Sequence, residues 1–174
     1  LLILGVFKKN SSKLIQNISL IVLLVTSVII LNETLSVEEK FLFNGSVIID
    51  YLSSLMKIIT LLAAFLVLVI SSSYLKIFKI FKIEYPILIL SSVLGMMVMI
   101  SSNDLMVFYM GLELQSLPLY VLASFNRDNL KSSEAGLKYF VLSALSSGLL
   151  LYGCSLIYGY STSTNFNIIA ESMV

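Results

Sequence analysis

The sequence predicts an all-α polytopic membrane helix bundle, and three features indicate this class. Of the 174 residues, 58% are hydrophobic and only 12% are charged. The mean hydropathy is +1.00, which is outside the range of soluble domains. The apolar residues gather in runs close to the roughly 20 residues that a helix needs to cross a bilayer, and short polar stretches separate the runs.

Five spans follow an incomplete first helix. The opening "LLILGVF" is too short to cross a bilayer and has neither an initiator Met nor a basic stretch before it. We therefore expect one transmembrane domain, 1–174, that is a fragment running from the tail of helix 1 to helix 6. Residues 32–49 are polar and acidic and are expected to form a loop. The expected helices cover 1–7 (truncated), 14–31, 50–75, 86–101, 104–125 and 134–159.

Local signals place the boundary between the fourth and fifth helices. Pro86 suits the first turn of a helix. Only "SSND" separates the helix that follows from the next one, so these two helices are expected to form an antiparallel hairpin. Asn103 or Asp104 is the expected N-cap of the fifth helix.

Basic residues mark one side of the membrane. In alternate loops they gather on the same side, which by the positive-inside rule is the cytoplasm or the mitochondrial matrix, and the N-terminus is then outside. The lysines at 76–82 fit topological anchors at lipid headgroups. The basic residues of this side are Lys8, Lys9, Lys13, Lys76, Lys79, Lys82, Arg127 and Lys131.

Glu113 is the charge least compatible with a membrane span. It lies within "FYMGLELQSLPLYVLASF", residues 108–125, close to mid-bilayer. A carboxylate there costs about 2.5–3.5 kcal/mol on insertion scales, so Glu113 is expected to face a protein interior or water. A proton- or ion-handling role is the main hypothesis, and a structural hydrogen bond between helices is the alternative.

Three neighbours of Glu113 are possible supporting residues. Gln115 and Ser116 lie within one turn of it, and Pro118 leaves a carbonyl near residue 114 without its usual donor. These groups could hydrate a file of water molecules or shape a kink.

Lys138 is the second candidate. It follows the expected start of its helix by about one turn, where it could act in the site or anchor at the interface beside Glu134. At 1.5 Å per residue, Glu113 would lie about 18 Å and Lys138 about 6 Å below the same surface, so direct contact is not expected. A water relay, or a different lysine as the partner of Glu113, fits this geometry better.

Other polar positions have simpler interpretations. Asp50 and Lys57 share one helix face and mark the outer interface, with a functional role as the alternative. Ser143 and Ser147, with Ala144 and Gly148 beside them, form a face for close helix packing.

Composition excludes several classes of function. The chain has no His and one cysteine, Cys154, so it offers neither a disulfide nor a Cys/His metal, haem or iron–sulfur site. A net charge of +1 gives no reason to expect a nucleic-acid partner.

The stretch "GLELQSLPLYVLASFNRDNLKSSEAGLKYFVLSALSSGLLLYGCSLIYG", residues 111–159, resembles the fifth and sixth helices of the subunit N family of bacterial respiratory complex I, called NADH dehydrogenase subunit 2 in mitochondria. "ELQSLPLY", "EAGLKYF" and "SSGLLLYG" carry the resemblance, and "DYLSSLMK" and "SSNDLMVFYMGLE" fit the same family. The resemblance covers residues 50–165 well, and the first fifty match mainly in topology.

The resemblance implies the antiporter-like fold, with fourteen helices in two inverted repeats and both termini outside. It implies that Glu113 is a proton-channel residue paired with a lysine of a seventh helix, and that Lys138 takes part in the proton path. It also implies a proton-translocating subunit of NADH:quinone oxidoreductase without a redox centre of its own. NADH, FMN, iron–sulfur clusters and quinone would belong to the parent complex, and the partners would be its other membrane subunits and the bilayer.

Two alternatives remain open from the sequence. One is a subunit of a multisubunit cation/proton antiporter or of a membrane-bound hydrogenase, which shares the fold. The other is a membrane scaffold in which Glu113 only links helices. The membrane is expected to be a bacterial inner membrane or the mitochondrial inner membrane.

Overall fold

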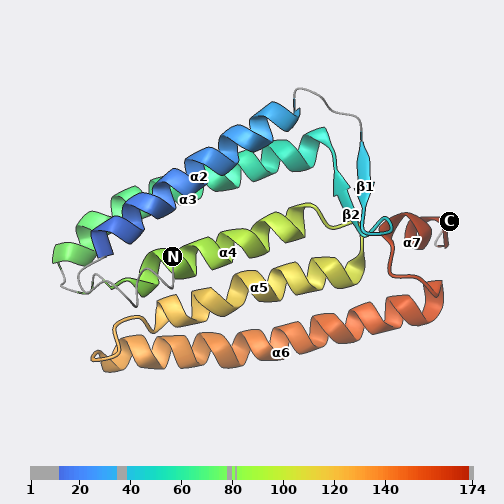
Figure 1. Cartoon of the computed structure of the whole chain (residues 1–174). Helices are drawn as coiled ribbons and strands as arrows, with labels where there is room; N and C mark the ends of the chain where they lie inside the picture. Colours follow the sequence, from blue (N-terminus) through green and yellow to red (C-terminus); the bar gives the residue numbers. More distant parts are fainter. Residues whose placement is uncertain (1–11, 35–38, 78–79, 81, 173–174) are drawn as a thin grey trace.

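A computed structural model describes residues 12–34, 39–77, 80 and 82–172 of the chain. Within this part, five long helices form a bundle, with a two-stranded β-hairpin and a short helix at one end (Figure 1). The long helices are α2 (Ser12–Thr34), α3 (Tyr51–Ile77), α4 (Glu84–Ile100), α5 (Leu105–Ala123) and α6 (Leu130–Ser161). The hairpin strands are β1 (Lys40–Leu42) and β2 (Val47–Ile49), and the short helix is α7 (Phe166–Ser172).

Successive long helices alternate in direction, so their connections gather at two opposite ends (Figure 1). One end holds the starts of α2, α4 and α6 and the ends of α3 and α5, and we call it the basic end. The β-hairpin and α7 lie at the opposite end, which we call the hairpin end. The described cations of the basic end are Lys13, Lys76, Lys82, Arg127 and Lys131.

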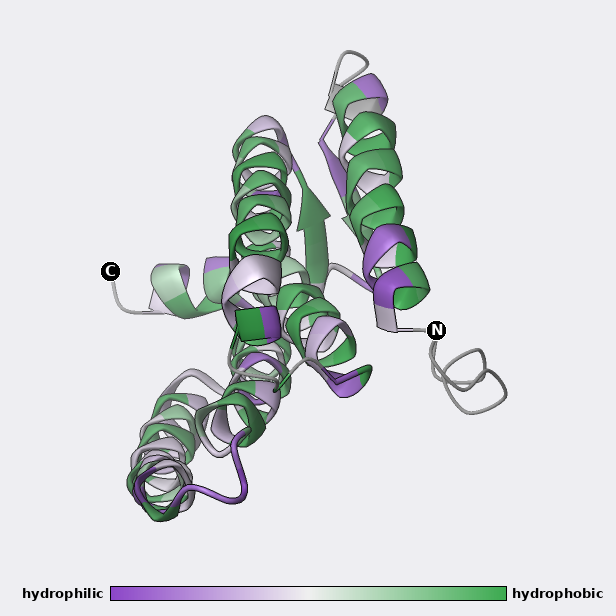
Figure 2. Ribbon diagram, turned by 90° about the vertical axis from the view of Figure 1, so that its left-hand side faces the viewer, coloured by the Kyte–Doolittle hydropathy of each residue, from purple (hydrophilic) through white to green (hydrophobic). Residues whose placement is uncertain are grey.

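The helices have the length and composition of membrane spans. Helices α2, α3, α5 and α6 are each long and apolar enough to cross a bilayer, and α4 is a shorter apolar helix of 17 residues. Hydrophobic residues cover the helices on most sides, and the hydrophilic residues gather at their ends (Figure 2). Large side chains such as Ile70 and Leu145 are exposed along these helices. Because lipid tails are apolar, this is the surface expected of a polytopic membrane bundle, and it confirms the predicted fold class.

A small apolar core joins α2, α3 and α4. Its buried members are Leu23, Leu61, Ala64, Leu68 and Val93. One polar group at this contact is paired: the Gln16 side-chain amide of α2 donates to the Leu68 carbonyl of α3 at 3.1 Å. Such pairing matters because hydrocarbon offers no hydrogen bonds to a buried polar group.

Helices α4 and α5 approach so closely that two glycines are required between them. A Cβ added to Gly95 would lie 2.4 Å from the Gln115 backbone nitrogen, and one added to Gly111 would lie 2.7 Å from the Met99 nitrogen. Small residues allow helix backbones in membranes to come this near. The contact holds the middle of α5, which carries Glu113, in a fixed position against α4.

The hairpin end is tied together by hydrogen bonds among three separate segments. The Ile48 amide of β2 donates to the Ser101 carbonyl at 2.9 Å, and the Asn103 side chain donates to the Gly45 carbonyl at 2.9 Å. The Leu105 amide donates to the Thr164 carbonyl at 2.8 Å. The hairpin, the α4–α5 turn and the loop after α6 therefore form one unit that fixes where α5 begins and where α6 ends.

The five long helices overlap the expected ranges, with ends that differ by up to four residues. The fifth helix begins after Asp104, whose side chain caps it by accepting from the Met106 and Val107 amides. The predicted loop 32–49 contains the β-hairpin, and the short helix α7 follows the last expected helix. Helix α6 begins at Leu130, capped by Asn129, rather than at residue 134. The expected truncated helix 1–7 lies outside the described residues.

Candidate functional site

Glu113 lies near the middle of α5 with a buried side-chain oxygen. Its Oε1 is shielded from solvent, and among the described residues no group hydrogen-bonds to it. At 1.5 Å per residue, it lies about 15 Å along α5 from the basic-end residue Ala123. A buried carboxyl oxygen without a donor is costly in any protein interior, and this cost marks Glu113 as the main candidate.

The periodicity of α5 shows which neighbour Glu113 faces. Gly111 and Gln115 contact α4, and Glu113, two residues from each, lies on the opposite side of the helix. Tyr120 and Ser124 follow Glu113 at seven and eleven residues, which are about two and three turns. Both contact α6, since the Tyr120 ring packs on Tyr139 and a Cβ on Gly136 would meet Ser124 at 2.5 Å. Glu113 therefore lies on the α6 side of α5.

The register between α5 and α6 places small polar residues opposite Glu113. The two helices are antiparallel, and Tyr120 lies opposite Tyr139 and Phe140. Seven residues back along α5 then correspond to about seven residues forward along α6, which brings Glu113 level with Ser147. Ser143 and Ser147 are half-buried on the face of α6 that also holds buried Gly136 and Cys154. Of the predicted packing face, Ser143 and Ser147 lie on the side of Glu113, whereas Ala144 and Gly148 are exposed among the described residues. We call the contact between the two helices the α5–α6 seam.

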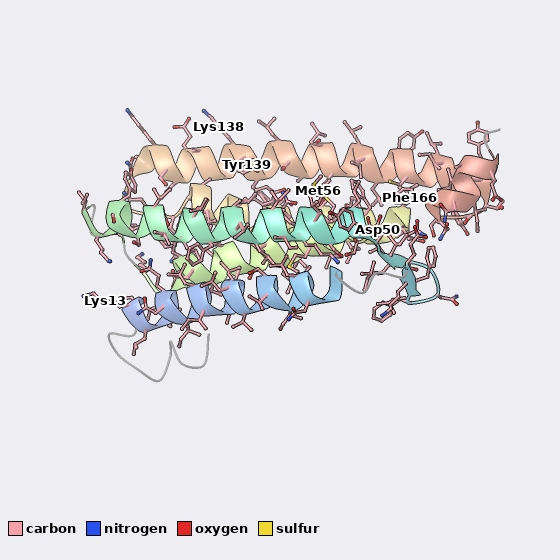
Figure 3. All side chains as sticks on the ribbon, turned by 90° about the horizontal axis from the view of Figure 1, so that it is seen from above. Lys13, Asp50, Met56, Lys138, Tyr139 and Phe166 are labelled. Atoms are coloured by element: carbon pink, nitrogen blue, oxygen red, sulfur yellow. The ribbon has the colours of Figure 1, made fainter. Side chains whose placement is uncertain are left out.

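Lys138 lies on the other side of α6. In the register set by Tyr120 against Tyr139 and Phe140, Lys138 is level with Leu122 of α5, nine residues or about 13.5 Å along the helix from Glu113. The two side chains therefore differ in depth by about the amount expected from the sequence. They are also separated by direction: Lys138 is 67% exposed and pairs with Glu134, on the side of α6 away from the other helices (Figure 3).

The supporting residues of α5 fall into two groups. Ser116, which is buried, donates its hydroxyl to the Glu113 carbonyl at 3.0 Å. Pro118 is also buried, and α5 continues through it. Gln115 faces α4 rather than the α5–α6 seam, and its buried Oε1 has no hydrogen-bond partner among the described residues.

The Ser92 hydroxyl of α4 is a buried polar group that the sequence does not indicate. It also lacks a partner within the described part of the chain. Ser92 lines a cavity of about 280 Å³ between α3, α4 and α5, whose other walls are mainly apolar and include Ala64 and Leu119. Ser91 and Ser92 are adjacent in an apolar helix. The sequence does not show which of them is buried, because burial depends on the neighbouring helices.

Asp50 and Lys57 lie at the hairpin end. The Asp50 carboxylate accepts from the Ser53 amide at 2.8 Å, and the Asp50 amide donates to the Ser53 hydroxyl at 3.1 Å, the reciprocal pattern of a capping box. The Ser53 side chain and amide hold the pKa of Asp50 below its usual value, and Lys57 contributes in the same direction. Asp50 therefore has a structural role at the start of α3.

Across the ranges that the structure describes, no three His, Cys, Asp or Glu side chains gather as a metal site would require. The polar groups of the bundle's middle are instead single carboxyl, amide and hydroxyl groups on α4, α5 and α6. Such groups can bind and pass protons or bind water.

Comparisons with known proteins agree with the fold and extend it. Residues 102–173 match the family model described as "NADH:quinone oxidoreductase/Mrp antiporter, TM". The chain is 69% identical over 173 residues to NADH-quinone oxidoreductase subunit N of Pelagibacter ubique, covering 99% of this chain and 36% of that protein. It is 51% identical over 172 residues to the Maricaulis maris subunit N, covering 98% of this chain and 35% of that protein.

Two solved structures share the fold. One is respiratory complex I from Thermus thermophilus with bound aureothin, with a TM-score of 0.78 and 29% identity over 94% of this chain and 35% of the matched chain. The other is the archaeal membrane-bound sulfane sulfur reductase, with a TM-score of 0.78 and 23% identity over 97% of this chain and 36% of the matched chain. The second likeness shows the fold alone.

These findings define the class as an antiporter-like membrane subunit. Within that class, the sequence identity to the subunit N proteins over nearly all of this sequence determines the family. The chain belongs to the subunit N family of NADH-quinone oxidoreductases, as its sequence motifs predicted. It spans about 36% of the length of the curated relatives it matches.

Proposed function

We propose that this chain supplies part of a proton-translocating membrane subunit of NADH:quinone oxidoreductase, and that Glu113 binds the transferred proton. The observation that carries the proposal is the buried Oε1 of Glu113, which has no hydrogen-bond partner among the described residues. A charged carboxylate at this depth costs about 2.5–3.5 kcal/mol, whereas the protonated form avoids that cost. A cation that approaches the seam would favour the ionised form instead and release the proton.

The counter-charge for Glu113 would come from outside the described residues. Lys138 lies about 13.5 Å nearer the basic end than Glu113, points away from α5 and pairs with Glu134. We propose that Lys138 acts on the outer face of α6, where it could exchange a proton with a neighbouring helix, while another lysine faces Glu113. NADH, FMN, iron–sulfur clusters and quinone would then be held by other subunits, and electron transfer there would drive the change of charge here.

The basic end would face the cytoplasm or the matrix. Lys13, Lys76, Lys82, Arg127 and Lys131 gather there, and positive charge in short loops favours retention on that side. The membrane would be the bacterial inner membrane or the mitochondrial inner membrane. Protons would then reach Glu113 from the basic end and leave toward the hairpin end.

The test is Glu113→Gln in the whole complex, reconstituted in proteoliposomes and assayed for NADH oxidation and proton uptake. Glutamine keeps the size and polarity of the side chain but cannot carry a proton, so proton transfer per NADH should fall. Glu113→Asp, which keeps the carboxyl, should retain part of it. Glu171→Gln, at an exposed position of α7, is the matched control. If Glu113→Gln assembles and pumps as the unmodified complex does, Glu113 has only a structural role, as in a scaffold.

Lys138 is tested separately. A proton role predicts that Lys138→Met lowers proton transfer more than Glu134→Gln does. If Lys138 serves only as an interfacial anchor, both substitutions break the same pair and should have equally small effects, because exposed pairs contribute only about 0–1 kcal/mol.

A further inference from the structure

A pocket at the basic end opens onto the α5–α6 seam. Its volume is about 560 Å³. Glu84 at the start of α4 and Arg127 after the end of α5 bring charge to the pocket. Charged groups therefore lie at the end of the contact between α5 and α6. The walls are formed by Tyr120, Val121, Ser124 and Phe125 on the α5 side and by Ser133, Gly136, Leu137 and Phe140 on α6.

Three aromatic rings lie between this pocket and the deeper part of the seam. The Tyr120 ring is 4.9 Å from the Tyr139 ring at 86° and 5.7 Å from the Phe140 ring at 76°. Both are edge-to-face contacts, which stabilise aromatic pairs by about 0.5–1.5 kcal/mol beyond area burial. Only 8% of Tyr120 is exposed. Tyr120 is therefore buried against the half-exposed rings of Tyr139 and Phe140, and we call these three rings the aromatic layer.

Polar groups lie on both sides of the aromatic layer. Toward the basic end are Glu84 and Ser124, which line the pocket. In the other direction lies Glu113, about 10.5 Å along α5 from Tyr120 at 1.5 Å per residue. Ser143 and Ser147 continue the same face of α6 at that depth. Tyr120 and the two rings against it therefore lie between the polar groups of the pocket and Glu113.

We propose that Tyr120 is a gating residue that separates water in the basic-end pocket from the Glu113 part of the seam. The inference deepens the proposed function, on which its meaning for proton transfer rests. Water and a proton would pass only when the Tyr120 ring leaves Tyr139 and Phe140. The ring itself closes the seam, so phenylalanine in its place should close it as well.

The test measures access to a cysteine placed beyond the aromatic layer. In the whole complex, Cys154→Ser removes the one cysteine of this chain, and Ser147→Cys adds a reporter. A small charged methanethiosulfonate reagent is applied to the basic-end side of sealed vesicles, and the labelled fraction of this chain is read by mass spectrometry. Tyr120→Ala should raise the labelling rate on the order of tenfold or more, because an open state about 0.1–10% populated would become the main one.

Matched variants distinguish a gate at Tyr120 from a general loss of helix packing. Tyr120→Phe should keep labelling as slow as in the reporter background. Tyr109→Ala removes the same side chain from the same helix on the hairpin-end side of Glu113 and should not speed labelling from the basic end. If Tyr120→Ala does not assemble, Phe140→Ala opens the aromatic layer from α6, where 49% of Phe140 is exposed, and should give the same rise.

The proposal is overturned if truncation of Tyr120 or Phe140 leaves labelling unchanged, or if Tyr120→Phe and Tyr109→Ala speed labelling as much as Tyr120→Ala. Labelling does not require Glu113 to carry a proton. A failed gate would therefore leave the Glu113→Gln result standing, and a Glu113→Gln complex that still pumps would leave the labelling result standing.

Discussion

The contact between α4 and α5 predicts that Gly95→Ala destabilises the bundle. The new Cβ would lie 2.4 Å from the Gln115 nitrogen and 2.8 Å from the Leu114 carbonyl carbon, whereas ordinary contacts begin at 3.4 Å. The neighbouring atoms are backbone and cannot rotate away, so the helices must separate by about 1 Å to restore ordinary packing. Overpacking of this kind costs about 1–3 kcal/mol.

The helix propensity of alanine opposes that cost. Replacing glycine by alanine inside a helix gains about 0.5–1 kcal/mol. The net effect of Gly95→Ala should therefore be a loss of up to about 2.5 kcal/mol in the free energy of unfolding. Gly148→Ala is the matched control, because nothing lies within 4 Å of its added Cβ among the described residues.

The assay is equilibrium unfolding of the detergent-solubilised protein in a sodium dodecyl sulfate titration, followed by tyrosine near-ultraviolet circular dichroism because the chain has no Trp. Gly95→Ala should unfold at lower dodecyl sulfate than the unmodified protein, and Gly148→Ala at the same or higher. Equal stability of the two alanine variants would show that α4 and α5 are farther apart at Gly95 than 2.4 Å from an added Cβ implies. The contact would then not fix the position of α5.

Two further predictions concern the hairpin end. Asp50→Ala should lower the free energy of unfolding by about 0.5–2 kcal/mol, as loss of an N-cap does. The pKa of Asp50 is below its usual value in the folded protein, so its contribution is present above the unfolded pKa of about 3.9 and is lost as the pH falls through the folded value. The stability difference between Asp50→Ala and the unmodified protein should therefore vanish in strong acid, and a constant difference across pH would contradict the cap. Thr164→Val removes the hydroxyl that donates to Asp104 Oδ2 and should speed amide hydrogen exchange at the start of α5, whereas Thr26→Val, which breaks only hydrogen bonds within α2, should not.

The spans could be predicted from the sequence because their length and hydropathy depend on no neighbouring helix. The N-cap of α5 is predicted as Asn103 or Asp104 for the same reason, since it is a local signal between two apolar runs, and the structure selects Asp104. The β-hairpin was missed although "FNGS" carries an Asn-Gly turn signal, because strands of three residues lie within a polar segment. The expected start of α6 is too late because the polar stretch "NRDNLKSSE" is typical of a loop, although Asn129 within it is a favourable N-cap.

The candidate site was only partly readable from sequence. Glu113 was identified because one carboxylate within an apolar run is a local anomaly. The direction in which it points, the serines opposite it and the aromatic layer above it depend on the pairing of α5 with α6. Tyr120 lies about two turns from Glu113 on the same face, which is a signal, but its partners Tyr139 and Phe140 follow only from the register of two helices.

The central claim is that Glu113 takes up and releases a proton during turnover, and infrared difference spectroscopy of the working complex tests it most directly. The spectrum of the complex changing between resting and NADH-reduced states should contain a protonated-carboxyl C=O band that shifts in deuterium oxide. That band should be absent in Glu113→Gln and present in the Glu171→Gln control. An unchanged carboxyl region in Glu113→Gln would contradict the claim, because the proton would then reside elsewhere.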